Sequence, residues 1–376
     1  MDYIIIGGGI YGTATAWELA QRGGEVLLLE ANEIACGASG GLGKRGVRAN
    51  GRDLRELPLM HLAYERWPTL HEEIGGPTGY ERIGHLLLME REQDLMAAPA
   101  RAWMQSQQGI PSELVNEDRL REMEPFVNEQ VKGALYCPLD GIADHTATTR
   151  SFAQAAMRAG AEIRERTRVA ELELSGDAIR AVITAEGEHI PVGKKLILLA
   201  NSAIHPMLQR LFNITLPIWH WLPQVMLTEP VDPMPLRHLI GHASRVLAMK
   251  SHHEGGNNSG QIMISGGWRG KWNEVSGQGE TLPDQVAGNL AEAVAAYPCL
   301  EGTEISQADA GRLETFSVDG IPIIDQVPGV ENLFYGTGWS GHGWAIAPAV
   351  ARLLADWVWS EEKPALLRPF AYGRFV

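Results

Sequence analysis

Residues 3–30 of the chain read YIIIGGGIYGTATAWELAQRGGEVLLLE, where an apolar strand leads into spaced glycines, a helix and a second apolar strand. Gly7, Gly9 and Gly12 have the spacing G-x-G-x-x-G. In this pattern the first glycine permits a tight turn, the second lets a pyrophosphate approach the backbone, and the third lets the helix lie close to the sheet. The helix, which starts at Ile10, then points its N-terminus at the phosphates.

The second strand ends in Glu30, where an acidic side chain accepts hydrogen bonds from the hydroxyls of an adenosine ribose. Glycines alone also occur in ordinary turns between strands and helices. The complete order of strand, glycines, helix, strand and carboxylate is more specific. It predicts an α/β fold with a Rossmann-type dinucleotide-binding domain.

Length and charge limit the classes of function. A chain of 376 residues, 45% of them hydrophobic, is long enough for two packed domains. Its formal net charge of −14 argues against nucleic acid or an anionic membrane surface as the main partner. No apolar run reaches the roughly 18 residues that span a bilayer. The first strand also leaves no room for a signal sequence, so we expect a cytoplasmic protein.

Cysteine and histidine patterns give no sign of a metal centre. Cys36, Cys137 and Cys299 are too few and too dispersed for a disulfide framework or a metal knuckle. His238 and His242 have i, i+4 spacing, but no HExxH motif surrounds them. We therefore expect no metal site.

The middle of the chain predicts a second domain of α+β type. Strands expected at residues 224–228, 245–249 and 261–265 are separated by proline-rich or polar connections, a pattern typical of an antiparallel sheet. Residues 195–200, KLILLA, are apolar on both faces. They fit the buried middle of a parallel sheet instead.

A basic segment follows the dinucleotide motif in this otherwise acidic protein. Five cations fall within twelve positions, namely Lys44, Arg45, Arg48, Arg52 and Arg55. Two interpretations are equally favoured. The segment is either a solvated basic loop or a surface that meets the anionic parts of a cofactor or substrate.

Residues 332–360, NLFYGTGWSGHGWAIAPAVARLLADWVWS, repeat the order strand, glycine-rich turn and apolar-faced helix. The helix start is a second site where backbone N–H groups support an anion. We expect the two ends of the chain to build one site.

Three motifs together resemble the flavin-dependent amine oxidoreductases that include glycine oxidase, D-amino acid oxidase and sarcosine oxidase. They are IIIGGGIYG at residues 4–12, SVDGIPII at residues 317–324 and GTGWSGHGWAIAPAV at residues 336–350. The resemblance covers nearly the whole chain. It implies FAD as the cofactor and oxidation of a small amino acid or secondary amine that carries a carboxylate, such as sarcosine, iminodiacetate, an opine, glycine or a D-amino acid.

The resemblance also implies a glutathione-reductase-like FAD-binding domain that is interrupted by a substrate domain. The FAD-binding domain is expected at residues 1–90, 140–215 and 310–376, and the substrate domain at residues 91–139 and 216–309. The expected FAD contacts are Gly7, Gly9, Ile10, Gly12, Glu30, Ala31, Ser39, Arg45, Val169, Ala200, Asn201, Arg312, Gly338, Gly341, His342 and Gly343.

Departures from the family pattern are informative. Arg312 stands where monomeric sarcosine oxidases have the cysteine that carries the flavin, so non-covalent FAD is expected. Ala345 replaces their substrate-binding lysine, and Glu314 stands where glycine oxidases have an arginine. We therefore expect the substrate carboxylate to be bound by Arg312, Arg48 or Lys250, with His342 near the reduced flavin.

Residues 140–156, DGIADHTATTRSFAQAA, resemble the beta subunits of multisubunit sarcosine oxidases, in which a histidine carries a covalent FMN. His145 falls at that position, although a histidine that simply opens a helix is the favoured interpretation. A partner subunit in a hetero-oligomer, or a homo-oligomer, is consistent with this likeness. The electron acceptor is expected to be oxygen or such a partner. The alternative function is a flavin-bearing electron-transfer subunit without turnover of its own.

Overall fold

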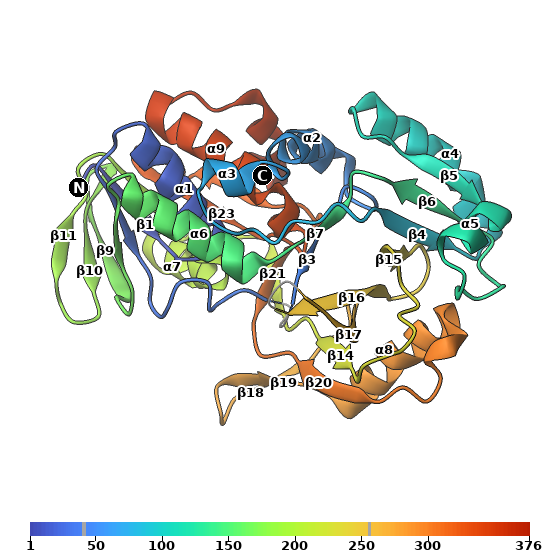
Figure 1. Ribbon diagram of the computed structural model, residues 1–376. Coiled ribbons are helices and arrows are strands. Elements are labelled where there is room, and N and C mark those ends of the chain that lie inside the picture. Colours follow the sequence, from blue (N-terminus) through green and yellow to red (C-terminus); the bar gives the residue numbers. More distant parts are fainter. Residues whose placement is uncertain (40–42, 255–256) are drawn as a thin grey trace.

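The computed structural model describes residues 1–39, 43–254 and 257–376. Two large sheets lie side by side, and the β9 to β11 meander and helix α4 project at opposite ends of the molecule (Figure 1). Among the described residues, no helix is long and apolar enough to cross a membrane.

The first sheet has six strands, and the neighbours β12, β1, β2 and β8 are parallel. β23 is parallel to β12, and only the edge strand β22 runs antiparallel. The strands of this sheet lie in the order β22 (Ile323–Gln326), β23 (Leu333–Thr337), β12 (Lys195–Leu198), β1 (Tyr3–Ile6), β2 (Val26–Leu29) and β8 (Glu162–Arg164). The position of β12 between β23 and β1 confirms the prediction from KLILLA.

Both faces of this sheet are covered. Side chains such as Ile5 and Leu28 pack against helices α1 (Ile10–Gln21), α2 (Leu57–Arg66), α6 (His145–Arg158) and α9 (Gly343–Ser360). The alternate side chains, such as Ile4 and Leu27, pack against α7 (Ile204–Phe212) and a meander of β9 (Val169–Ser175), β10 (Ala178–Thr184) and β11 (His189–Pro191). Strands buried on both faces need apolar residues at every position, as the sequence has here.

The second sheet has eight strands and is antiparallel except where β15 runs parallel to β4. Its order is β20 (Ile305–Asp309), β14 (Val225–Thr228), β17 (Asn257–Ser265), β16 (Ala248–Glu254), β15 (Leu239–His242), β4 (His85–Met89), β6 (Gly133–Cys137) and β5 (Glu113–Asn116). Helices α4 (Glu92–Gln107), α5 (Glu117–Met123) and α8 (Pro283–Ala296) accompany it. The α/β fold with a second, mainly antiparallel sheet is therefore confirmed.

The division into domains stays a prediction, but strand pairing corrects one boundary. Residues 85–89 were expected in the first domain, whereas β4 pairs with β6 and β15 of the second sheet. Pairing with partners far along the chain decides where a strand belongs, and the local pattern of residues 85–89 carries no information about those partners.

Smaller elements lie outside the two large sheets. Two of them are short antiparallel pairs, β3 (Arg45–Val47) with β7 (Gly141–Ala143), and β13 (Ile218–Trp221) with β21 (Glu314–Ser317). The remaining elements are β18 (Lys271–Asn273), β19 (Gln278–Glu280), α3 (Leu70–Glu73), η1 (Leu54–Glu56), η2 (Asn201–Ala203), η3 (Pro298–Leu300), η4 (Ala365–Phe370) and η5 (Tyr372–Phe375).

Candidate active site

The glycine loop between β1 and α1 is shaped by steric requirements at Gly7 and Gly12, two of the three glycines of the G-x-G-x-x-G pattern. Gly7 has a φ of +117°, and a β-carbon there would lie 2.6 Å from the carbonyl oxygen of Leu199. A β-carbon at Gly12 would overlap the carbonyl oxygen of Gly7. Gly9 differs, because no described atom lies within 4 Å of the place a β-carbon would take. This open space at the start of α1 fits the close approach of a dinucleotide pyrophosphate.

Glu30 follows β2 and lies beside this loop. One carboxylate oxygen accepts a hydrogen bond from Gly8 N at 2.6 Å, and the other accepts one from Asn32 N at 2.8 Å. The carbonyl of Glu30 accepts a hydrogen bond from Thr167 N, two residues before Val169 starts β9. The carboxylate is thus held in place, with acceptor capacity left for a ribose hydroxyl.

The C-terminal glycine turn packs directly against the N-terminal helix. Tyr11 Oη donates a hydrogen bond to the carbonyl of Gly343 at 2.5 Å, and the Tyr11 ring stacks on Trp339 with 3.5 Å between centroids. Gly338 and Gly341 have φ values of +70° and +72°, so this turn depends on residues without a β-carbon. The structure thereby brings the two glycine-rich ends of the chain together.

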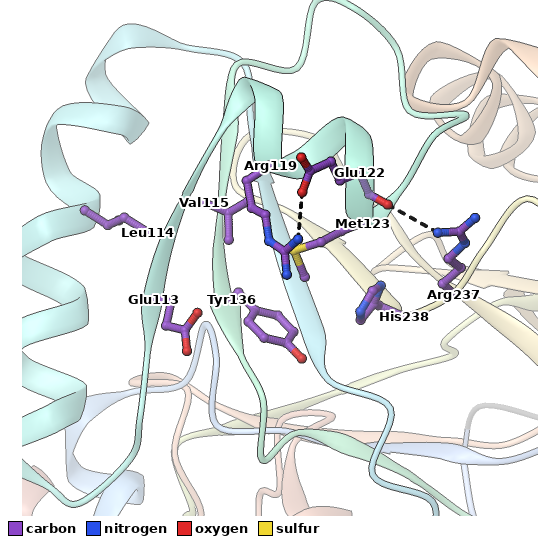
Figure 2. A pocket seen from close by; sticks show the side chains of 9 residues that line it. All are labelled: Glu113, Leu114, Val115, Arg119, Glu122, Met123, Tyr136, Arg237 and His238. Carbon is purple, nitrogen blue, oxygen red and sulfur yellow. Dashed lines mark hydrogen bonds and ion pairs between the residues drawn. The ribbon is translucent and has the colours of Figure 1, made fainter.

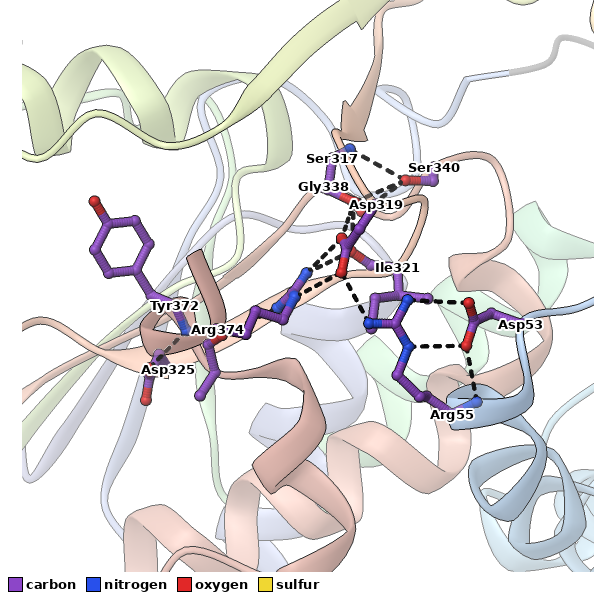
Figure 3. A network of polar contacts seen from close by, with 11 residues as sticks. Asp53, Arg55, Ser317, Asp319, Ile321, Asp325, Gly338, Ser340, Tyr372 and Arg374 are labelled. Carbon is purple, nitrogen blue, oxygen red and sulfur yellow. Dashed lines mark hydrogen bonds and ion pairs between the residues drawn. The ribbon is translucent and has the colours of Figure 1, made fainter. Parts of the chain in front are cut away.

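Two residues of the motif SVDGIPII connect this turn to other parts of the fold by hydrogen bonds and ion pairs. Asp319 lies between two arginines, with 2.9 Å to Arg374 Nε and 3.0 Å to Arg55 Nη1 (Figure 3). The backbone N–H of Ser317 donates a hydrogen bond to Ser340 Oγ at 3.2 Å, within the glycine turn. The aspartate of the motif is therefore a structural connection between the turn, η5 and η1.

Cations from two distant parts of the chain lie near enough to influence one another. Arg45 lies on β3, Arg48 follows that strand, and Lys250 lies on β16 of the second sheet. Burial and the nearby charges of Arg45 and Arg48 lower the pKa of Lys250 to about 7. Burial also lowers the pKa of Arg45 to about 10, against the opposing effects of Asp309, Glu314 and Asp144. Within the described residues, no carboxylate lies within ion-pair distance of Lys250.

Arg48 is held by a chain of contacts that reaches the C-terminal turn. Its Nη1 donates to the carbonyl of Asn50 at 2.6 Å, and its own carbonyl accepts from Arg52 Nε at 2.6 Å. Arg52 also donates to the carbonyl of His342 at 2.6 Å and pairs with Glu56 at 3.1 Å. Lys44 and Arg52 are buried, and Arg45 and Arg48 are half-buried, whereas Arg55 is exposed. This favours the interpretation of a segment facing a ligand.

His342 is the N-cap residue of α9. Burial, with the charges of Arg48 and Arg52, holds the pKa of this imidazole well below its ordinary value. His342 is therefore neutral near pH 7, and positive potential here comes from the arginines and the N-terminus of α9.

Glu314 is a buried carboxyl group on β21. Ser39 Oγ donates a hydrogen bond to one of its oxygens, and Thr315 N donates to the other at 3.0 Å. Burial raises the pKa of Glu314, although these hydrogen bonds, Asn201 and Arg45 act in the opposite direction. In the sequence, Glu314 stands out only because it replaces an arginine, and no local pattern of residues indicates that it is buried. Its neighbours Ser39 and Asn201, which follows Ala200, were both expected near the cofactor.

The surroundings of Arg312 and His145 give little support to carboxylate binding by Arg312 or to covalent flavin attachment at His145. The Arg312 side chain is exposed and its Nε donates to the carbonyl of Cys36 at 2.8 Å, so the structure does not place it with Arg48 and Lys250. His145 is the first residue of α6, after the N-cap Asp144. Burial and the charge of Arg45 lower the pKa of His145 to about 3, so it is a neutral neighbour of that arginine.

A surface pocket of about 360 Å³ lies elsewhere, beside β5, β6 and α5 (Figure 2). Arg119 and Glu122 form an ion pair of 2.7 Å there, and Arg237 donates to the carbonyl of Glu122. None of the expected site residues lines it. Among the described residues, no group of three or more His, Cys, Asp or Glu side chains is arranged to hold a metal ion.

Comparisons with known proteins agree on the family. The family model described as "DAO: FAD dependent oxidoreductase" matches residues 2–357. The chain is 26% identical to the sarcosine oxidase subunit beta of Arthrobacter sp, over an alignment covering 100% of this chain and 91% of that protein. It is 24% identical to the glycine oxidase of Bacillus licheniformis, covering 95% of this chain and 92% of the relative. Of the longer mitochondrial sarcosine dehydrogenase of Mus musculus, 23% identical, the chain spans 39%.

Solved structures share the fold. L-proline dehydrogenase from P. horikoshii superimposes with a TM-score of 0.87 at 23% identity, covering 100% of this chain and 97% of that one. Glycine oxidase from Bacillus cereus ATCC 14579 has a TM-score of 0.81 at 24% identity, with 97% of each chain covered. Because the family model matches residues 2–357 and the glycine loop has room for a pyrophosphate at Gly9, the chain belongs to the DAO family of FAD-dependent oxidoreductases, enzymes that act on amines and amino acids.

Proposed function

We propose that the protein oxidises a small amino acid or secondary amine that carries a carboxylate, such as an N-substituted glycine, at the carbon next to nitrogen. The imine product is then hydrolysed to an amine and an oxo acid. The relatives named sarcosine oxidase and glycine oxidase support this substrate class.

The observation that carries the proposal is buried Lys250, whose charge is influenced by the half-buried Arg45 and Arg48. Lys250 is 6% exposed, and its lowered pKa reflects a charge buried beside two arginines. A substrate carboxylate placed between Lys250 and Arg48 would relieve this repulsion and form charge-assisted hydrogen bonds. Arg312 remains a candidate anchor from the sequence, but its exposed position gives it less support.

The roles of the chain's own residues follow from this arrangement. Bound FAD supplies the acceptor for the two electrons removed from the substrate. Lys250 and Arg48 bind the carboxylate and thereby fix the carbon that loses a hydride. The N-terminus of α9 stabilises negative charge near the C-terminal turn, where His342 is neutral. A substrate amine that binds in neutral form requires no strong base.

Anaerobic flavin bleaching tests the proposal. The purified protein is mixed with sarcosine, glycine, iminodiacetate and D-alanine, and loss of the flavin absorbance is followed at several concentrations. Lys250→Met and Arg48→Met are each expected to raise the half-saturating concentration by about ten- to a hundredfold, the value of one charge-assisted contact. Lys271→Met, an exposed lysine on β18, is the control and should match the wild type.

Other outcomes point elsewhere. If Arg312→Met raises the half-saturating concentration and Lys250→Met leaves it unchanged, the carboxylate is bound by Arg312 instead. A wild-type flavin that no amine or amino acid bleaches would overturn the oxidation and favour the electron-transfer subunit. Rapid reoxidation by air after bleaching would identify oxygen as the acceptor, and slow reoxidation would indicate a partner protein.

The flavin is proposed to be non-covalent, because Arg312 stands where related enzymes have their flavin-bearing cysteine. Acid precipitation should then release the colour into the supernatant. Colour that stays in the pellet, and is lost in His145→Ala, would instead indicate the histidine linkage.

A further inference from the structure

Asp140 is a fully buried carboxylate beside the segment that carries Arg48. It lies in the connection between β6 and β7. β7 pairs antiparallel with β3, and the last pair of this register joins Val47 to Gly141. Asp140 and Arg48 lie one residue beyond that pair, Asp140 before β7 and Arg48 after β3. A buried carboxylate is costly unless donors or cations compensate it, so its partners indicate what it does.

The donors to the Asp140 carboxylate come from the segment after β3 and from two elements that pack around it. Oδ1 accepts hydrogen bonds from Ala49 N at 2.7 Å and from Tyr64 Oη of α2. Oδ2 accepts one from Asn50 N at 3.3 Å, and His85 Nδ1 of β4 lies 3.4 Å from it. The carboxylate therefore fixes two successive backbone N–H groups just after β3.

The second of these residues in turn holds the Arg48 guanidinium. The carbonyl of Asn50 accepts a hydrogen bond from Arg48 Nη1 at 2.6 Å. The side chain of Asn50 is also fixed, because its Nδ2 donates to the carbonyl of Leu135 on β6 at 2.7 Å. One chain of contacts thus runs from the Asp140 carboxylate through Asn50 to the guanidinium. Movement of Asn50 would release the Arg48 side chain.

Arg48 keeps donors available for a ligand. Among residues 1–39, 43–254 and 257–376, its Nε and Nη2 atoms have no hydrogen-bond partner. A guanidinium held at Nη1 presents this remaining edge in a fixed direction, which suits bidentate binding of a carboxylate. Burial lowers the pKa of Arg48 to about 10, Arg52 acts in the same direction, and the nearby negative charge of Asp140 opposes both. Arg48 therefore remains charged at neutral pH.

We propose that Asp140 is a positioning residue for Arg48, which fixes Asn50, and through Asn50 the guanidinium, in the orientation that binds the substrate carboxylate. This inference rests on the proposed function, in which Arg48 binds that carboxylate. Asp140 itself does not touch the substrate. Because the guanidinium is oriented before the ligand arrives, less conformational freedom is lost on binding.

An unreactive carboxylate, 3,3-dimethylbutanoate, measures binding apart from catalysis. It is titrated into the FAD-loaded protein, and the shift in the visible flavin spectrum gives the dissociation constant. Asp140→Asn keeps the size of the side chain, removes its charge and replaces the acceptor for Asn50 N by an amide NH₂ group. It should raise the dissociation constant about three- to tenfold, the value of one lost hydrogen bond. Arg48→Met should raise it about ten- to a hundredfold.

A double-mutant cycle separates positioning from general destabilisation. If Asp140 acts through Arg48, then adding Asp140→Asn to Arg48→Met should weaken binding no further. A residue that only stabilises the fold would weaken binding by the same factor in both backgrounds. Asp325→Asn is the matched control, because Asp325 of β22 accepts hydrogen bonds from Lys363 Nζ and Tyr372 N, each at 2.8 Å. It should lower the melting temperature and leave the dissociation constant unchanged.

Tyr64→Phe is a milder change that decides the question if Asp140→Asn does not fold. It removes the hydroxyl that donates to Asp140 Oδ1 and accepts from Ala49 N at 2.9 Å, and it leaves the carboxylate charged. It should raise the dissociation constant about threefold, and only when Arg48 is present. Binding as tight as in the wild type would then overturn the inference.

Failure of the inference differs from failure of the proposed function. If Arg48→Met weakens binding but Asp140→Asn does not, or if Asp140→Asn acts equally in both backgrounds, Arg48 still binds the carboxylate and Asp140 does not position it. If the wild type does not bind 3,3-dimethylbutanoate, or if Arg48→Met binds it as tightly as the wild type, the anchor at Arg48 is wrong and the inference falls with it. A flavin that no amine bleaches overturns the oxidation alone, since the cycle still reports on Asp140.

Discussion

Lys250 of β16 is energetically costly, because its ammonium group is buried and the charges of Arg45 and Arg48 oppose its own. Its pKa of about 7 means that the charged form predominates only below that pH. Binding of a carboxylate ligand by the free enzyme should therefore weaken as pH rises through about 7. Spectral titration with 3,3-dimethylbutanoate from pH 6 to 9 measures this, and Lys250→Met should bind weakly with no such dependence.

The same shift has a consequence for stability. The pKa of Lys250 in the folded protein, about 7, lies below the ordinary 10.5, so the unfolded chain binds more protons between these values. The free energy of unfolding should then rise with pH over this range. Lys250→Met should remove that contribution and raise the melting temperature of the ligand-free protein near pH 7, as scanning calorimetry would show. A melting temperature lowered by the substitution would contradict this account.

Gly9 is the residue at which cofactor binding can be separated from folding. A side chain there meets no described protein atom but occupies the space of the pyrophosphate, so Gly9→Val should fold and be purified nearly colourless. Gly373→Val, at another open position of ordinary backbone conformation, should keep its flavin. The ratio of flavin to protein absorbance measures the flavin content of both variants. Full flavin content in Gly9→Val would show that the cofactor does not bind at this loop.

At the scale of elements, Asp319 connects η5 and η1 to the turn after β21. Burial acts to raise its pKa, but Arg374 and Arg55 outweigh this and hold the pKa below its usual value. Asp319→Asn should lower the free energy of unfolding by about 1–2 kcal/mol at neutral pH, since the carboxylate is partly exposed. Asp118→Asn, an exposed carboxylate on α5, should have little effect.

The pH dependence provides a second check on this element-scale contact. A lowered folded pKa stabilises the protein above the unfolded value of about 3.9, and the effect is lost as pH falls through the folded value. The melting temperatures of wild type and Asp319→Asn should therefore converge in acid. A constant difference at all pH values would assign the loss to something other than charge.

At the scale of the whole molecule, the candidate site is assembled from segments spread over the entire chain, including Gly9, Ser39, Asn201 and Gly341. FAD bound to all of them should stabilise the folded state by about 2.7 kcal/mol when its concentration is a hundred times the dissociation constant. Removing FAD should lower the melting temperature, and adding it back should restore it. Gly9→Val should melt at the same temperature with or without FAD. An unchanged melting temperature in the stripped wild type would indicate that the segments are held together by protein contacts alone.

The sequence by itself determined the first sheet, the glycine loop and the α/β class, because hydrophobic period and glycine spacing express local backbone and packing requirements. It also limited the carboxylate anchor to a few cations. Only the tertiary structure decided that Arg48 and Lys250 lie together while Arg312 is exposed, that β4 belongs to the second sheet, and that Glu314 is buried. Burial, strand partners and the distance between charges depend on contacts between residues far apart in the chain, and no local pattern of residues encodes them.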